Sequence, residues 1–400
     1  MASIRVPQLS DLVGDTDVFF EDYFNRKPMI RLGALKSDAT ELLSAEMLDE
    51  LLVSDAIRPP YIAVTKSGEL VHPRTYTETR RIQRDTITDA VIPTRVIEHF
   101  KTGATITWSS LNHYLPHIRQ LTRGLSEAFG TRSDAVGFVT PAGRRGFKPH
   151  RDSVDVFVIQ TEGTKDWLLW NPSLQRDGVA DWYSLEELGE PDHRITLQPG
   201  DVLYLPFGTP HCASATETTS VHLSLMVKSR RWRDILVDLV TEAVSSDLRF
   251  AGNPLLDPEN EKFEIELRSA VEALSGKLSA VHWRDAIRNL RSMPHAGEGS
   301  TANDFFTSQM AADSLGASSA LRRRTGAHVS VQVDEGASDG QLEVNGSTYR
   351  VPRAAIDLVK RILDGETIRI DELDGAPNQN VDFARSIVRL EIAEVVGGSD

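Results

Sequence analysis

The chain has 400 residues, of which 40% are hydrophobic and 26% are charged, so it is long enough for a sizeable core and for more than one domain. Its formal net charge is −14, which argues against general binding of nucleic acid, because the phosphates would be repelled. The acidic balance suits a basic protein partner or simply gives solubility.

The first hundred residues are expected to mix helices with short strands. Residues 1–10 lack the basic and apolar regions of a secretory leader. An aromatic-rich helix is predicted to run from Phe19 and to end before Pro28, because proline disfavours helix in the preceding residue. Ser44–Leu52 combines a serine N-cap with a helical apolar spacing. The polar and charged residues from Arg74 to Asp89 are expected to form a surface loop.

Many short apolar strands, separated by Gly and Pro turns, follow between residues 103 and 228. Strands are predicted at Gly103–Trp108, Ala135–Thr140, Asp166–Trp170, Arg194–Leu197, Val202–Leu205 and Ser220–Lys228. One amphipathic helix, His117–Phe129, is predicted to end with Gly130 at its C′ position. Short strands with this punctuation predict a β-sandwich or a barrel.

Beyond Ser229 the pattern changes to helices. Amphipathic helices are predicted at Trp232–Phe250, Phe263–Leu278 and Trp283–Leu290, and their apolar faces must be buried against something. Residues 294–320 are rich in Gly, Ser and Ala and are interpreted as a linker. The short strands and helices after it are compatible with a small winged-helix-like domain, in which acidic residues outnumber basic ones. We therefore expect three parts: residues 1–230, 231–310 and 311–400.

No apolar run in the chain approaches the roughly 20 residues of a membrane-spanning helix. The only cysteine, Cys212, cannot form an internal disulfide, which fits a reducing compartment. We therefore expect a cytoplasmic protein that does not bind membranes.

Two candidate metal ligands stand two residues apart at the head of an apolar run. His150 and Asp152 follow a turn rich in Gly and Pro, and on a strand their side chains would share one face. A second histidine would complete a 2-His-1-carboxylate triad, which leaves positions on Fe(II) open for oxygen and a co-substrate. The pair alone is weak evidence, because a lone histidine is usually exposed or packed. His211 is the candidate third ligand, since it also follows a Pro/Gly turn.

These motifs together resemble the double-stranded β-helix of the cupin and JmjC oxygenases, which use Fe(II), 2-oxoglutarate and O2. Within that family, the chain is most similar to the ribosomal oxygenases. The resemblance rests on the segments Tyr23–Pro28, Gly146–Asp152, Glu162–Trp167, Asp201–His211 and Ser220–Leu225. It also covers the order of the parts: a β-rich catalytic domain, a helical segment of the dimerisation type and a winged-helix-like domain. It implies that His150, Asp152 and His211 are the metal ligands and the catalytic residues.

The resemblance also implies residues that bind the co-substrate. Lys165 would pair with the distal carboxylate of 2-oxoglutarate, and Thr140 would add a hydroxyl contact. Without the resemblance, Lys165 would be interpreted as a solvated turn lysine. His222 is as readily a packed histidine as a pocket residue, and we do not count it as a ligand. Relatives carry Asn, Tyr and Ser at three pocket positions that here hold Val136, Phe138 and Met226.

Three functions are open at this point. The first is an Fe(II)/2-oxoglutarate-dependent hydroxylase that acts, as a homodimer, on a side chain of a protein or peptide. A ribosomal protein or a peptide precursor would be its substrate, and the acidic chain favours a basic one. The second is a hydroxylase of a free amino acid or another small metabolite, which the same metal site would serve. The third is a non-enzymatic cupin and winged-helix binding protein.

Overall fold

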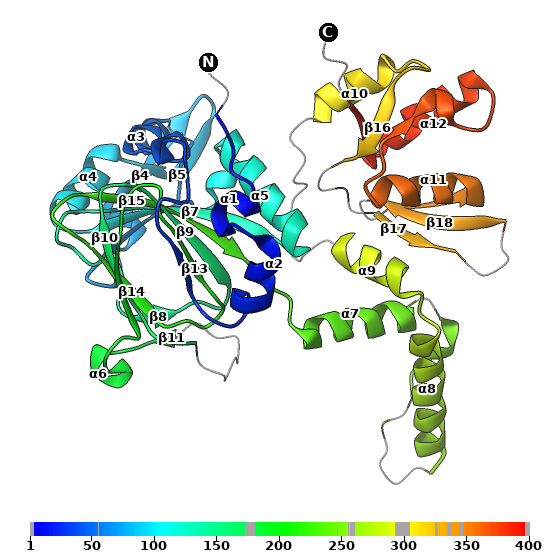
Figure 1. Ribbon diagram of the computed structural model, residues 1–400, viewed down its shortest axis with the longest axis horizontal. Coiled ribbons are helices and arrows are strands. Elements are labelled where there is room, and N and C mark those ends of the chain that lie inside the picture. The colour runs from blue at the N-terminus through cyan, green and yellow to red at the C-terminus, as the bar shows by residue number, and fades with distance from the viewer. Residues whose placement is uncertain are drawn as a thin grey trace. The chain divides into compact units, whose positions relative to one another are not determined.

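The computed structural model describes residues 4–54, 56–172, 181–245, 247–254, 256, 261–292, 305–324, 327, 329–333, 338–344 and 347–396. The chain divides into two compact units, residues 1–229 and 230–400 (Figure 1). Within the described residues, no helix combines the length and the apolar character that crossing a bilayer requires.

The first unit is built on two antiparallel sheets (Figure 1). The larger sheet has the strand order β1-β13-β9-β15-β7-β6-β2-β3 and the smaller has the order β11-β8-β14-β10-β12. The larger sheet consists of β1 (Met29–Arg31), β2 (Ile62–Lys66), β3 (Glu69–Leu70), β6 (Thr105–Trp108), β7 (Ser133–Thr140), β9 (Asp155–Glu162), β13 (Val202–Leu205) and β15 (Ser220–Val227). The smaller sheet consists of β8 (His150–Arg151), β10 (Lys165–Leu169), β11 (Asp181–Trp182), β12 (His193–Leu197) and β14 (His211–Ala215). The predicted β-rich architecture of this part is confirmed.

Strand β9 shows why its sequence is a nearly continuous apolar run. Successive side chains on a strand point to opposite faces of the sheet. Phe157 and Ile159 belong to the core that the larger sheet shares with helices. Val156 and Val158 instead pack with Trp167 and other residues of the smaller sheet. A strand that is covered on both faces needs apolar residues at every position, so it loses the polar alternation of a half-exposed strand.

Helices pack on the outer face of the larger sheet. They are α1 (Leu9–Val13), α2 (Thr16–Val18), the π-helical turn η1 (Phe19–Tyr23), α3 (Ala45–Val53), α4 (Pro93–Lys101) and α5 (Pro116–Phe129). Gly130 ends α5 in the left-handed conformation, at φ 62°, as its C′ position predicted. The predicted aromatic helix is shorter than expected and ends at Tyr23.

The prediction of a surface loop between Arg74 and Asp89 is wrong. This stretch contributes to a hairpin of β4 (Thr77–Ile82) and β5 (Asp85–Val91), which pair antiparallel. Most side chains of the hairpin are exposed, so its strands carry charged and threonine residues instead of an apolar face. Threonine favours strands, so the threonines of this stretch indicated β-structure despite its polar character.

The second unit contains helices followed by two small sheets. The helices are α7 (Trp232–Ser245), η5 (Leu248–Phe250), α8 (Glu261–Ser279), α9 (Trp283–Ser292), α10 (Phe305–Asp313), α11 (Arg353–Leu363) and α12 (Pro377–Arg389). The sheets have the orders β20-β16-β21 and β17-β18-β19. Their strands are β16 (Ala320–Arg323), β17 (Val329–Gln332), β18 (Asp339–Val344), β19 (Ser347–Pro352), β20 (Ile368–Arg369) and β21 (Ala393–Val396). Of the predicted linker, residues 294–304 lie outside the described part, and α10 is helical where a linker was expected.

Candidate active site

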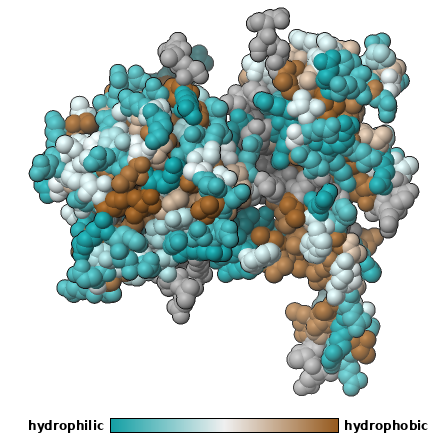
Figure 2. All heavy atoms as spheres, viewed as in Figure 1, coloured by the Kyte–Doolittle hydropathy of each residue, from teal (hydrophilic) through white to brown (hydrophobic). Residues whose placement is uncertain are grey.

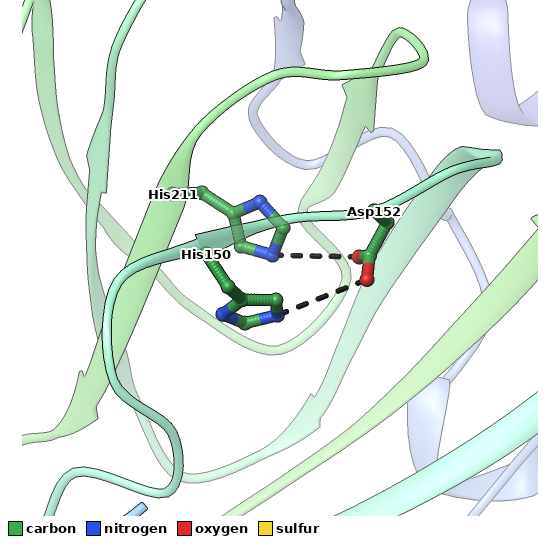
Figure 3. A group of neighbouring side chains, drawn as sticks. All are labelled: His150, Asp152 and His211. Atoms are coloured by element: carbon green, nitrogen blue, oxygen red, sulfur yellow. Dashed lines mark ion pairs between the residues drawn. The ribbon is translucent and has the colours of Figure 1, made fainter. Parts of the chain in front are cut away.

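The structure brings the three predicted metal ligands together, two from the smaller sheet and one from the connection that follows β8. His150 and His211 are paired neighbours on β8 and β14, and Figure 3 shows both rings directed toward the carboxylate of Asp152. One ligand atom from each residue lies within 4.8 Å of the others. The prediction that His150 and Asp152 share one strand is wrong: β8 ends at Arg151, so Asp152 lies in the connection to β9. The carboxylate converges on the histidines through this bend in the chain.

Hydrogen bonds fix the turn that carries His211 against the connection that carries Asp152. The backbone N–H of Gly208 donates to the carbonyl oxygen of Asp152 at 3.0 Å. The N–H of Phe207 donates at 3.2 Å to the buried carboxylate of Asp155, which also accepts from the hydroxyl of Tyr204 at 2.6 Å. The positions of two ligands are therefore set by backbone contacts that do not depend on a bound ion.

Both histidines present the same nitrogen to the centre of the site. Nδ1 of His150 lies 2.8 Å from the carbonyl oxygen of Lys148, and Nδ1 of His211 lies 2.9 Å from that of Thr209. A carbonyl can only accept, so each Nδ1 carries a proton, and in the neutral ring Nε2 is then the nitrogen with the lone pair. These Nε2 atoms lie 3.9 Å (His150) and 3.7 Å (His211) from the carboxylate oxygens of Asp152.

Electrostatics favour neutral His211. Burial, followed by the charge of His150, lowers the pKa of His211 to about 4, against the opposing effect of Asp152. A neutral imidazole is the form that binds a metal ion. Two imidazole nitrogens and one carboxylate are a donor set that Fe(II) accepts, and donors on one ion at roughly 2.1 Å lie about 3–4 Å apart. The residues therefore fit a divalent metal ion.

A buried cation lies deeper between the sheets. Lys165 is 3% exposed, and its Nζ donates to Oγ1 of Thr140 at 3.1 Å and lies 3.4 Å from Nδ1 of His222. Across the described residues, no carboxylate lies within 4.0 Å of this ammonium. Burial lowers the pKa of Lys165 to about 7. A buried cation without a counterion is costly, so the site fits an anionic ligand such as a carboxylate.

Trp167 connects the two halves of the site. Its ring is stacked against His211, with 5.8 Å between centroids, and lies edge-on to His222 at 5.8 Å. Its buried indole N–H has no hydrogen-bond partner among the described residues. Contacts run from His211 through Trp167 and His222 to Lys165, so the buried lysine and the metal ligands belong to one connected group of side chains.

Further residues lie next to Lys165 and Thr140 whose roles were not predicted from the sequence. His222 is buried, and its ring is stacked on Phe138 with 4.7 Å between centroids and 4° between planes. Thr105 donates to Thr140 at 3.2 Å. The alternation of β15 could have indicated the position of His222. Leu223 and Leu225 face the helical core, so His222 must face the opposite side, toward Lys165.

Of the three positions at which the sequence differs from its relatives, Val136 and Phe138 lie in β7 and Met226 lies in β15. Phe138 and Val136 pair with His222 and Ser224 across these strands, and Met226 lies further along β15. Burial of Val136 and the stack of Phe138 on His222 make this wall apolar and aromatic, as expected from the sequence.

Gly163 shapes the turn before Lys165, and its replacement by alanine is expected to destabilise the protein. Its φ is +61°, and a Cβ would lie 2.0 Å from the carbonyl oxygen of Thr219. We expect Gly163→Ala to lower the free energy of unfolding by at least about 2 kcal/mol, seen as a lower Tm. Gly143→Ala is the matched control, because φ is +68° but nothing lies within 4 Å of its Cβ, so it should cost only about 1 kcal/mol. Equal losses in the two variants would contradict the steric argument.

Comparisons with known proteins agree with this site. Residues 112–235 match the JmjC domain family. The chain is 31% identical over 235 residues to the bifunctional lysine-specific demethylase and histidyl-hydroxylase NO66 of Drosophila mojavensis, covering 57% of this chain and 25% of that protein. It is 33% identical over 189 residues to ribosomal oxygenase 2 of Bos taurus, covering 44% of this chain and 40% of that protein. The chain thus spans less than half of the length of these two curated relatives.

Solved structures give the same fold over nearly the whole chain. The crystal structure of the Escherichia coli ribosomal oxygenase YcfD matches with a TM-score of 0.56 and 18% identity, covering 96% of this chain and 99% of that one. YcfD in complex with cobalt and 2-oxoglutarate matches with a TM-score of 0.54, 18% identity and the same coverage. The predicted resemblance is confirmed: residues 112–235 match the JmjC domain family, and the chain is similar to NO66 and to ribosomal oxygenases.

Proposed function

We propose that the protein is an Fe(II)/2-oxoglutarate-dependent dioxygenase that hydroxylates a side chain of a protein. His150, Asp152 and His211 would hold Fe(II), and Lys165 with Thr140 would bind the distal carboxylate of 2-oxoglutarate. When bound, the iron would supply the activation of O2. The observation that carries the proposal is a 2-His-1-carboxylate set connected by packed side chains to a buried lysine that has no carboxylate partner among the described residues.

A protein substrate is supported by the relatives, whose names describe a histidyl-hydroxylase and ribosomal oxygenases. The net charge of −14 favours a basic partner, and ribosomal proteins are the first class to test. The same charge supports the view that nucleic acid is not the substrate.

The test combines co-substrate turnover with mass spectrometry. Purified protein with Fe(II), O2 and 2-oxoglutarate should produce succinate faster when ribosomal proteins are added. One of those proteins should gain the mass of one oxygen atom, and Asp152→Ala should abolish the gain. Stimulation by free amino acids alone would instead support a small-metabolite hydroxylase. No succinate under any condition, together with no metal binding, would refute an enzymatic role and favour a binding protein.

We also propose that the helices of residues 231–310 form a homodimer interface. The support is a set of large apolar side chains left exposed on three helices, which Figure 2 shows in brown over α7 and α8. They are Trp232, Leu236, Val237, Ile265, Leu267, Val271, Trp283 and Ile287. Monomers rarely expose apolar surface on this scale, and a second copy would bury the same face on both partners.

Charge on this face is expected to dissociate the dimer. We expect the double variant Leu236→Glu and Val271→Glu to be monomeric in analytical ultracentrifugation at concentrations where the wild type is dimeric. Glu272→Gln, next to Val271 on the exposed surface of α8, is the matched control and should remain dimeric. A monomeric wild type, or a double variant that stays dimeric, would contradict this interface.

Residues 311–400 are proposed to form a winged-helix-like domain. The small sheets and the helices α10, α11 and α12, which share one buried core, support this proposal. A cytoplasmic location is supported by the single cysteine, Cys212, which is buried.

A further inference from the structure

Among the buried histidines of the described residues, His222 is the one that the proposed chemistry does not use. It is 3% exposed, lies on β15 and pairs with Phe138 across to β7. Its Nδ1 lies 3.4 Å from Nζ of Lys165. In the described part of the chain, Lys165 is the only hydrogen-bond partner of the His222 side chain.

The hydrogen bonds of Lys165 leave one donor for a ligand. An ammonium has three N–H groups. Oγ1 of Thr140 accepts one at 3.1 Å, and Nδ1 of His222 is placed to accept the second. The direction of the third N–H is then fixed, because two acceptors on a flexible side chain determine the orientation of its end.

The ring plane of His222 is also fixed. Phe138 stacks on it with 4.7 Å between centroids and 4° between planes, and Trp167 meets it edge-on. A ring packed on two sides cannot turn easily to offer Nε2 to the lysine in place of Nδ1. The contact between His222 and Lys165 is therefore specific to one nitrogen.

We propose that His222 is a positioning residue for co-substrate selection: through Nδ1 it orients Lys165 to bind the distal carboxylate of a 2-oxo dicarboxylic acid. The inference rests on the proposed function, because it takes 2-oxoglutarate as the co-substrate. It predicts that His222 contributes to binding of the distal carboxylate and not to binding of the 2-oxo acid group near the metal ligands.

Asparagine and glutamine distinguish the two ring nitrogens. The amide oxygen of Asn can occupy the place of Nδ1, whereas that of Gln reaches the place of Nε2. We expect His222→Gln to weaken binding of 2-oxoglutarate to the full-length, Mn(II)-loaded protein by about tenfold, measured by calorimetry. His222→Asn should stay within about threefold of the wild type, because it keeps the acceptor for Lys165.

A ligand without the distal carboxylate provides the second comparison. Binding of 2-oxobutanoate, a monocarboxylic 2-oxo acid, should change less than about twofold in either variant, because it has no group for Lys165 to bind. Phe138→Leu removes the stacking ring but keeps the imidazole, and it should produce a smaller loss that is also confined to 2-oxoglutarate.

The outcomes separate this inference from the proposed function. If Gln and Asn variants weaken both ligands equally, His222 only supports the fold, and the inference is wrong. The inference also fails if the Gln variant binds 2-oxoglutarate like the wild type while Lys165→Met does not bind it. If the wild type itself does not bind 2-oxoglutarate, the proposed function fails first.

Discussion

Replacing His150 or Asp152 with alanine is expected to abolish tight Fe(II) binding and to lower succinate formation more than about 100-fold. Loss of a group that only supports a ligand typically costs about ten- to 100-fold, so loss of a ligand itself should cost more. The fold should survive, because Asp152 is partly exposed and its side chain's only ion pairs within the described part of the chain are those of 3.9 and 3.7 Å to the histidines. Mn(II) should raise the Tm of the wild type and leave the Tm of the variants unchanged.

His193→Ala is the matched control for His150→Ala. His193 lies exposed on β12 of the same sheet, so its loss removes an imidazole without touching the site. It should bind Mn(II) and turn over 2-oxoglutarate like the wild type. Full metal affinity in the His150 and Asp152 variants would show that the ion binds elsewhere.

The sequence was sufficient to predict the ligand types and the β-rich fold, because both follow from local patterns. The turn, strand and histidine sequence around His211 repeats the pattern around His150, and Gly/Pro turns mark the ends of short strands. What it could not predict is how ligands converge. His150 and Asp152 were expected on one strand, whereas the strand ends at Arg151 and the N–H of Gly208 holds the bend. Such contacts join residues far apart in the sequence and leave no local pattern.

The burial of Lys165 is a second feature that depends on contacts between residues far apart in the sequence. In sequence it is a turn lysine, and only the packing of two sheets buries it beside Thr140 and His222. The opposite holds for the hairpin of β4 and β5, whose polar residues indicate a loop although the backbones pair as strands without an apolar face. The polarity of a residue predicts its burial well only where the fold supplies no hydrogen-bonding partner for a buried polar group.

Lys165→Met is expected to abolish binding of 2-oxoglutarate and, at the same time, to stabilise the ligand-free protein. Met fills a similar volume but cannot donate to the distal carboxylate, so affinity should fall by at least about 100-fold, as expected for loss of a buried, charged hydrogen bond. Lys165 itself destabilises the ligand-free protein, since it has no carboxylate partner among the described residues and burial lowers its pKa to about 7. The protein therefore gives up stability to hold a binding group in place.

The stabilisation should depend on pH in a defined direction. In the unfolded chain Lys165 keeps its usual pKa of 10.5, so between pH 7 and 10.5 the unfolded state binds more protons than the folded state. Stability attributable to this residue therefore rises with pH across that window, and the full cost applies below pH 7. Lys165→Met should gain roughly 2–4 kcal/mol at pH 6, and the gain should shrink toward pH 10. Urea denaturation at several pH values measures this difference.

Co-substrate binding supplies an independent readout of the same group. A carboxylate beside Lys165 favours the ammonium and raises its pKa, so the wild type should take up part of a proton when it binds 2-oxoglutarate near pH 8. Calorimetry in two buffers of different ionisation enthalpy measures that uptake. Lys101→Met, an exposed lysine of α4, is the control and should change neither stability nor uptake. Lys165→Met protein that is less stable than the wild type at pH 6, or wild type that binds without proton uptake, would mean that Lys165 is already charged and compensated in the empty pocket.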